Sequence, residues 1–124
     1  MVNFYKKIGK ATVIVVSLFA VTTAQAQNSI YAWGNGDYGK IGTGNTTQQN
    51  SPVQIGTVTD WSQVSSGNAY SLALKSNGTL WVWGWNNFGE LGIGTTTGQN
   101  TPVQVGTATN WSQVSAGQDH SLAV

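Results

Sequence analysis

The sequence predicts an all-β fold, made of two four-stranded antiparallel blades of a β-propeller. Residues 30–74 align with residues 80–124 at an offset of 50, without a gap and with 24 of 45 positions identical. A period of this length is typical of repeat units that each leave an apolar face for a neighbouring unit to cover. Short aromatic and β-branched runs alternate with glycine-rich turns, and no stretch keeps a helical period. Four strands in about 50 residues is the size of one propeller blade.

The first 26 residues have a different character and predict a helical signal peptide. Lysines fall within residues 6–10, an apolar run follows at residues 11–21, and small residues then favour cleavage between Ala26 and Gln27. The apolar run is shorter than the roughly 20 residues that a membrane-spanning helix needs. We therefore expect a bacterial chain that is secreted or reaches the cell surface, with no membrane association after the signal is removed.

Residues 27–124 form the predicted propeller part, with repeat 1 at about 30–79 and a truncated repeat 2 at about 80–124. Arrays of this kind generally need about three or more units for stability. Two repeats therefore indicate an N-terminal fragment of a longer protein, to be joined by further repeats of that protein. The alternative is a short chain that closes a ring by self-association.

Strands are expected where aromatic and β-branched residues cluster between turns. Asn77-Gly78 is a strong hairpin signal because both residues tolerate positive φ, so Tyr70–Lys75 should pair with residues 79–83. The expected strands are residues 30–33, 53–55, 61–65, 70–75, 80–83, 103–105, 111–115 and 120–124.

The residues that recur are mainly glycine, proline and tryptophan, as expected for turns and for core positions between sheets. The four recurring tryptophans are interpreted as blade core. The pairs are Trp33 and Trp83, Gly34 and Gly84, Gly39 and Gly89, Gly42 and Gly92, Gly44 and Gly94, Pro52 and Pro102, Trp61 and Trp111, Gly67 and Gly117, and Ser71 and Ser121.

This pattern resembles the regulator-of-chromosome-condensation repeat. The resemblance also rests on residues 39–44, 51–53, 61–67 and 71–80 of the first copy and on residues 83–92 and 115–123 of the second. The resemblance covers residues 30–124. It implies a seven-bladed β-propeller of four-stranded blades, which usually meets its ligands on one of two flat faces.

Charge disfavours nucleic acid as a partner. Beyond residue 26 the chain carries two lysines, four acidic residues and no arginine, a net charge of −2. Binding to phosphate backbones requires a positive surface.

Neither a catalytic residue, a cofactor nor a metal site is predicted. Residues 34–39 match the glycine spacing of a dinucleotide-binding loop, but no helix is expected to follow. His120 is the sole histidine and the chain has no cysteine, so the usual zinc ligand sets are missing. The acidic residues do not recur in register, and the spacing of Asp37 and Glu90 does not indicate a carboxylate pair for glycoside hydrolysis.

Trp85, Asn86, Asn87 and Phe88 form the candidate binding loop, because Trp85 has no aromatic counterpart in repeat 1 and follows a strand directly. Filling the gap between blades is the alternative role. The sequence thus predicts an exported, non-catalytic interaction scaffold within a larger cell-surface or secreted protein, with a protein or surface partner.

The resemblance leaves two alternative functions open. One is a secreted enzyme inhibitor, because a β-lactamase inhibitory protein is built on a similar propeller. The other is guanine-nucleotide exchange, the activity of the founding family member, which an export signal disfavours.

Overall fold

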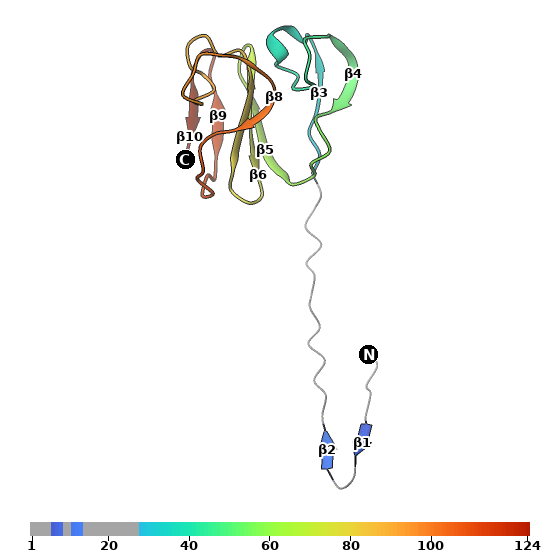
Figure 1. Cartoon of the computed structure of the whole chain (residues 1–124). Helices are drawn as coiled ribbons and strands as arrows, with labels where there is room; N and C mark the ends of the chain where they lie inside the picture. Colours follow the sequence, from blue (N-terminus) through green and yellow to red (C-terminus); the bar gives the residue numbers. More distant parts are fainter. Residues whose placement is uncertain (1–5, 9–10, 14–27) are drawn as a thin grey trace.

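The computed structural model describes residues 6–8, 11–13 and 28–124, and its regular structure is β-strand with one short 3-10 turn (Figure 1). Every pairing between its strands is antiparallel. The predicted all-β fold is therefore confirmed. None of the described residues belongs to a helix that is long and apolar enough to cross a membrane.

Within the predicted signal peptide, six described residues form strands β1 (Lys6–Ile8) and β2 (Ala11–Val13), which pair with each other. The expectation of a helix is wrong at these residues, where Ile8, Thr12 and Val13 are β-branched and favour the extended conformation. The rest of residues 1–26 and the predicted cleavage site at Ala26 and Gln27 lie outside the described residues.

One blade is complete. It is a four-stranded sheet in the order β5 (Trp61–Ser66), β6 (Tyr70–Lys75), β7 (Leu80–Gly84) and β8 (Gln99–Gln104). The turn at Asn77-Gly78 joins β6 to β7 and places Leu74 opposite Leu80, which confirms the predicted hairpin. Because this hairpin crosses the boundary between the two sequence repeats, the complete blade takes two strands from each.

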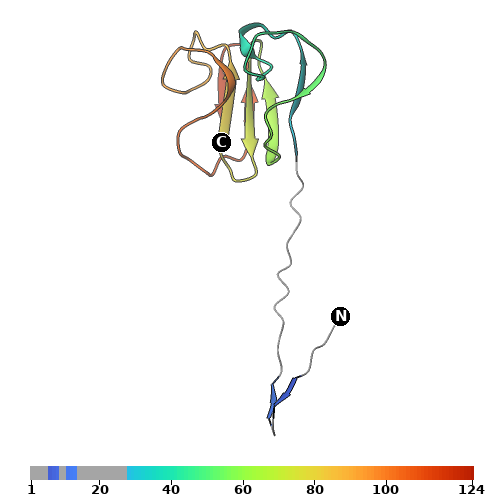
Figure 2. The same cartoon turned by 45° about the vertical axis from the view of Figure 1, so that its right-hand side comes forward.

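The remaining strands form two half-blades, one on each side of the complete blade (Figures 1 and 2). The N-terminal half-blade is β3 (Tyr31–Gly34) with β4 (Gln49–Gln54), and the C-terminal half-blade is β9 (Val114–Ala116) with β10 (Ser121–Ala123). The expected division into two four-stranded blades thus becomes one blade and two halves. By the offset of 50, β3 and β4 correspond to β7 and β8, whereas β9 and β10 correspond to β5 and β6.

Strand lengths differ from the prediction in a regular way. The outer strands β4 and β8 begin four residues earlier than expected and include Pro52 and Pro102. Proline is tolerated there because an outer strand leaves one row of N–H groups free of partners. In contrast, β9 and β10 are shorter than expected, since the described chain offers no further strand to β10.

The core lies between successive sheets. Trp83 is 1% exposed and packs in a cluster with Trp61, Ala73 and three isoleucines from the N-terminal half-blade and its flanking residues, namely Ile30, Ile41 and Ile55. Trp61 meets both Trp81 and Trp83 edge to face, with ring centroids 6.1 and 6.3 Å apart. Burial of such large aromatic rings is the main attraction that holds neighbouring blades together.

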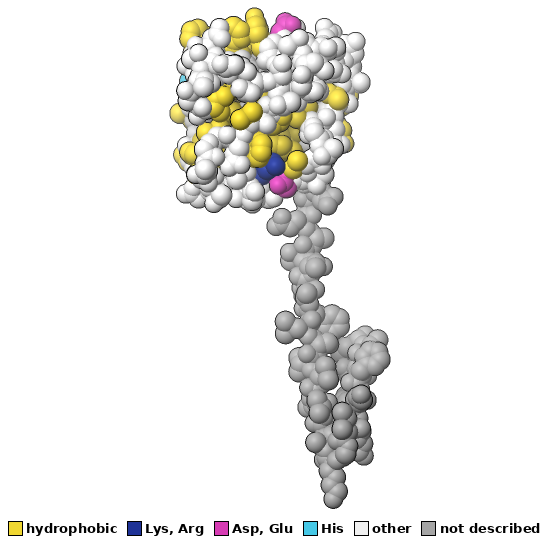
Figure 3. Space-filling view, viewed as in Figure 1, with side chains coloured by type: hydrophobic (Ala, Val, Ile, Leu, Met, Phe, Trp, Pro, Cys, Tyr) yellow, Lys and Arg dark blue, Asp and Glu magenta, His cyan; other side chains and the backbone are white. Residues whose placement is uncertain are grey.

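At the edge of this cluster, the half-buried Lys75 covers two indole rings. Its Nζ lies 4.3 Å from the centroid of the Trp81 ring and 5.1 Å from that of Trp61. It also lies 3.6 Å from an Asp60 carboxylate oxygen, an ion pair too long for a hydrogen bond. Figure 3 shows this place as a basic and an acidic side chain beside hydrophobic ones.

Replacing Gly78 with alanine should destabilise the fold by about 2–4 kcal/mol. Gly78 has a φ of 76°, and an added Cβ would collide with the carbonyl oxygen of Thr109. Gly56→Ala is the matched control, because Gly56 has a φ of 62° but no atom within 4 Å of such a Cβ. The control should cost only about 1 kcal/mol. Urea unfolding measures both, and equal losses would contradict the close packing of the hairpin on residue 109.

Candidate binding surface at the loop end

Two equivalent long loops, residues 35–48 after β3 and residues 85–98 after β7, lie at the same end of the molecule (Figure 1). Each follows a Trp-Gly pair whose glycine turns the chain out of the sheet with a positive φ, 105° at Gly34 and 108° at Gly84. Residues on loops held by a rigid sheet are typical binding positions. The aromatic side chains of these loops are therefore the first candidates for a contact role.

Three aromatic residues, Tyr38, Trp85 and Phe88, make up what we call the loop-end aromatic surface. The rings of Tyr38 and Trp85 meet edge to face, with centroids 4.3 Å apart and an angle of 65° between their planes. Tyr38 is 51% exposed and Phe88 is 76% exposed. Figure 3 shows hydrophobic side chains exposed at this end of the molecule. Exposed, clustered aromatic residues are common anchors of protein interfaces.

Tyr38 lies in the short 3-10 segment η1 (Asp37–Gly39) and has a φ of 62°. This left-handed conformation is unfavourable for a bulky side chain. Among the described residues, Tyr38 alone combines a side chain with a positive φ. Backbone strain of this kind gathers at functional positions when the surroundings enforce it, and here the strained backbone holds Tyr38 against Trp85.

The four residues of the predicted binding loop play different parts. Phe88 and Asn87 are exposed, and Trp85 is half-buried where it bridges to Tyr38 of the neighbouring loop. Trp85 fills the gap between adjacent units, as the alternative role predicted, and keeps part of its surface in solvent. Asn86 is fully buried and is unable to contact a partner.

Asn86 instead holds the loop in shape. Its Nδ2 donates to the carbonyl oxygens of Thr95 and Thr97 at 2.8 and 3.0 Å, and its Oδ1 accepts the N–H of Leu91 at 2.9 Å. One side chain therefore satisfies three backbone groups across the loop. The buried carboxylate of Glu90 adds a fourth bond by accepting the N–H of Phe88 at 2.9 Å. These bonds fix the loop that presents Phe88.

Sequence reasoning did not single out Tyr38 as a contact residue. The signal that identifies it is the offset of 50, which aligns Tyr38 with Phe88. Its contact with Trp85 depends on how the two units pack side by side, and that packing is not visible in the spacing of the residues.

Three acidic residues of the described chain have separate contacts. Asp37 accepts from the Nδ2 of Asn35, Asp60 pairs with Lys75, and Glu90 is engaged with Phe88. Asp37 and Glu90 thus have separate partners. Throughout the described residues, no three His, Cys, Asp or Glu side chains are placed to hold a metal ion.

His120 is exposed on the C-terminal half-blade, at the position that corresponds to the buried Tyr70. The Tyr70 hydroxyl, with one proton to donate, faces the backbone carbonyl oxygens of both Gly117 and His120, so His120 contributes to this contact through its main chain. The imidazole ring is not packed in a core, because no sheet among the described residues covers it.

The recurring tryptophans also differ from one another. Trp61 and Trp83 are buried, as expected for blade core, and Trp111 is half-buried. Trp33 is 62% exposed, contrary to its expected place in the core. The reason is that, among the described residues, no sheet packs on the face of β3 that carries Trp33, whereas Trp83 packs against the adjacent half-blade.

Comparison with known proteins gives one consistent result. The model of the regulator of chromosome condensation (RCC1) repeat matches residues 27–74 and 77–124, and a second model of the same repeat matches residues 61–90. Among solved structures, human WBSCR16 is 28% identical, with a TM-score of 0.69. The match covers 78% of this chain and 26% of WBSCR16.

Prp20p of Saccharomyces cerevisiae, described with its binding properties to Gsp1p and histones, is 19% identical with a TM-score of 0.70, over 78% of this chain and 26% of that one. Yeast RCC1 (Prp20) bound by Kap60 is 24% identical with a TM-score of 0.65, over 78% and 23% of the two chains. These likenesses show a shared fold. The chain spans about a quarter of the length of each of these proteins.

Replacing Asn86 with alanine should destabilise the protein by about 2–3 kcal/mol, because three backbone groups lose their partner away from solvent. Asn87→Ala, at the exposed neighbour, should change stability by no more than about 0.5 kcal/mol. Thermal or urea unfolding compares the two variants. A similar loss in both would show that the buried amide does not organise the loop.

Proposed function

Because the chain belongs to the regulator of chromosome condensation (RCC1) repeat family, whose model matches nearly all of residues 27–124, we propose that it is an exported, non-catalytic interaction scaffold. In this proposal it contributes propeller blades to a larger cell-surface or secreted protein. Its partner is a protein or another surface, and nucleic acid is disfavoured by the net charge of −2 beyond residue 26.

The loop-end aromatic surface is the observation that carries this proposal. Tyr38 and Phe88 present exposed rings from two adjacent units, and Trp85 joins the two loops into one surface. Rigid aromatic rings give a large contact area at low cost in conformational entropy. Two of the similar structures belong to a yeast protein with protein partners, which agrees with an interaction role without identifying a partner for this chain.

The proposal that the chain is non-catalytic rests on the contacts that its acidic side chains make. The carboxylates of Asp37, Asp60 and Glu90 each have one oxygen in a contact that stabilises a loop or a strand end, and Asp119 is exposed. A catalytic acid or base must instead be free to reach a substrate proton.

The export part of the proposal rests on the lysines, apolar run and small residues of positions 6–26. If residues 1–26 are fused to a reporter enzyme that folds only after export, the fusion should be active outside the cytoplasm. Mass spectrometry of the secreted chain should find Gln27 as the first residue. Replacing Lys6, Lys7 and Lys10 with glutamate should abolish most of the exported activity. A chain that keeps residues 1–26 would contradict this part.

Contact at the loop-end aromatic surface can be tested by photo-crosslinking in the cells that produce the chain. A photoreactive amino acid in place of Phe88 should capture a partner several-fold better than one in place of Val58, which is also exposed but lies in the β4–β5 loop at the opposite end (Figure 1). Tyr38→Ala should lower the capture at position 88. Equal capture at both positions would contradict the proposed surface.

A further inference from the structure

The chain holds one of its own cations between two aromatic rings, and this contact shows what a cation site needs. Trp61 and Trp81 meet edge to face, with an angle of 83° between their planes. The Nζ of Lys75 lies 5.1 and 4.3 Å from the centroids of these two rings and 3.6 Å from an oxygen of Asp60. The electron-rich ring faces and the carboxylate attract the same ammonium group. Two angled rings and one carboxylate therefore hold a lysine side chain in this molecule.

The same three components occur together at the loop end. Tyr38 and Trp85 form an edge-to-face pair, and Asp37 directly precedes Tyr38 and is exposed. We call Asp37, Tyr38 and Trp85 the loop-end corner. No lysine or arginine of the described chain makes an ion pair with Asp37 or lies over either ring. The loop-end corner thus has the components of a cation site, and the described chain supplies no cation to it.

The carboxylate of Asp37 is held in place by a neighbour in its own loop. The Nδ2 of Asn35 donates to Oδ2 of Asp37 at 2.9 Å, and the Oδ1 of Asn35 accepts the N–H of Asp37 at 3.0 Å. The other carboxylate oxygen, Oδ1, accepts no hydrogen bond from the described chain. A group fixed before its partner arrives loses little entropy on binding. Asp37 is therefore oriented and still has an oxygen for an incoming donor.

The two units contribute different parts of the loop-end corner. At the offset of 50, Asp37 corresponds to Asn87, and Trp85 corresponds to Asn35. The first loop supplies the carboxylate and the second supplies the indole, so neither loop carries both. A cation at the loop-end corner would contact both units at once, at the place where Tyr38 meets Trp85.

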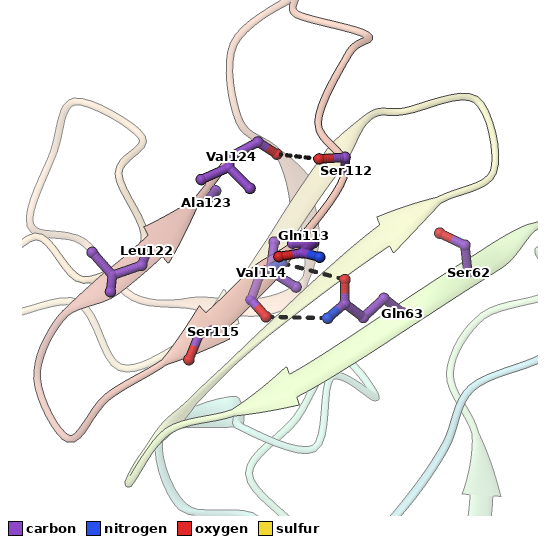
Figure 4. Close-up of a pocket in the computed structure, with 9 residues that line it drawn as sticks. All are labelled: Ser62, Gln63, Ser112, Gln113, Val114, Ser115, Leu122, Ala123 and Val124. Carbon is purple, nitrogen blue, oxygen red and sulfur yellow. Dashed lines mark hydrogen bonds between the residues drawn. The ribbon is translucent and has the colours of Figure 1, made fainter.

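Contacts that join neighbouring units elsewhere use neutral groups, which argues against a structural role for the Asp37 carboxylate. The Gln63 amide joins β5 to β9 by donating to the carbonyl oxygen of Val114 at 3.2 Å and accepting its N–H at 3.3 Å (Figure 4). The Nε1 of Trp83 donates to the carbonyl oxygen of Lys40 at 3.0 Å. The Asp37 carboxylate, in contrast, bonds Asn35 within its own loop.

Charge is distributed unevenly between the two ends of the sheets. Asp60 and Lys75 cancel at the end opposite the long loops. The turn before β10 lies at the loop end, because it corresponds to the turn before β6, where Ala69 accepts the N–H of Trp85. The other charged residues beyond residue 26 lie in the long loops and in this turn, and they are Asp37, Lys40, Glu90 and Asp119.

The net charge of −2 beyond residue 26 therefore falls at the loop end. Figure 3 shows an acidic side chain among hydrophobic ones at this end, whereas the basic side chain in view lies toward the opposite end. A negative surface favours encounters with a positive partner.

From these observations we propose that the loop-end corner binds a lysine or arginine side chain from a basic segment of a protein partner. The cationic group lies against the rings of Tyr38 and Trp85 and donates a hydrogen bond to Asp37. A quaternary ammonium group suits the corner less well, because it has no N–H for the carboxylate. The inference rests on the proposed function, in which the loop-end aromatic surface contacts a partner, and it adds the chemistry of that partner.

Titration of the full chain with a short peptide of alternating lysine and glycine tests the proposal. In NMR spectra of the isotope-labelled chain, the backbone amide signals of Asp37, Tyr38 and Trp85 should shift most. The same peptide with acetylated lysines should leave these signals unchanged, because acetylation removes the charge. Shifts centred on Asp60 or Asp119, or equal shifts with the acetylated peptide, would overturn the proposal.

Asp37→Asn should raise the dissociation constant of the lysine peptide about two- to fivefold, as expected for an exposed ion pair. The loop should keep its shape, because the new amide oxygen still accepts from Asn35 and the equivalent position is Asn87. Asp119→Asn is the matched control, since it removes an exposed carboxylate at the same end. Because that charge is screened from the corner, the control should leave binding within about 1.5-fold. Equal weakening would show attraction to net charge alone and refute the site.

Tyr38→Leu should weaken binding of the lysine peptide about two- to fivefold, because leucine keeps an apolar side chain but has no ring face for a cation. Tyr31→Leu is the matched control, since Tyr31 is also exposed and lies on β3 outside the loop-end corner. The control should bind as the unmodified chain does. Unchanged binding in Tyr38→Leu would refute the part assigned to the rings.

The capture experiment at position 88 separates this inference from the proposed function. Undiminished capture at position 88 in a chain with Asp37→Asn would keep the loop-end aromatic surface as a contact site and exclude the cationic side chain. Equal capture at positions 88 and 58, together with peptide binding at the loop-end corner, would contradict the proposed function alone. If vesicles of phosphatidylcholine shift the corner signals and the lysine peptide does not, the ligand is a lipid headgroup and the inference is overturned.

Discussion

The contact between one unit and the next, centred on Trp83, is the constraint on which the rest of this structure depends. A single blade has two apolar faces and is unable to cover either alone. Trp83 fills the space against the N-terminal half-blade, and its Nε1 bonds the carbonyl oxygen of Lys40. An indole suits this place because its large apolar ring packs between sheets while its N–H reaches one main-chain acceptor.

The same constraint aligns the loop-end aromatic surface. Once Trp83 sets the spacing of adjacent units, their long loops lie side by side and Tyr38 meets Trp85. The loops have little regular structure of their own, and buried groups such as the Asn86 amide hold their shape. The exposed aromatic rings are therefore presented by a rigid frame, which would lower the entropy lost in the contact proposed for them.

Much of the fold could be predicted from the sequence. The offset of 50 revealed the repeat, and Asn77-Gly78 located the hairpin between β6 and β7. The ends of β4 and β8 were missed because Pro52 and Pro102 argue against a strand unless the strand is known to lie at a sheet edge. The role of Asn86 could not be predicted either, because nothing in the sequence distinguishes a buried asparagine from an exposed one.

The sequence by itself determined the repeat unit, its antiparallel strands and the residues that recur in turns and core, because hydrophobic pattern and turn chemistry act locally. Only the tertiary structure decided which strands share a blade and which equivalent residues are buried. Trp33 and Trp83 follow the same local pattern, yet one is exposed and the other buried. Burial depends on whether a neighbouring sheet is present, and that is a property of the assembled units, not of the residue.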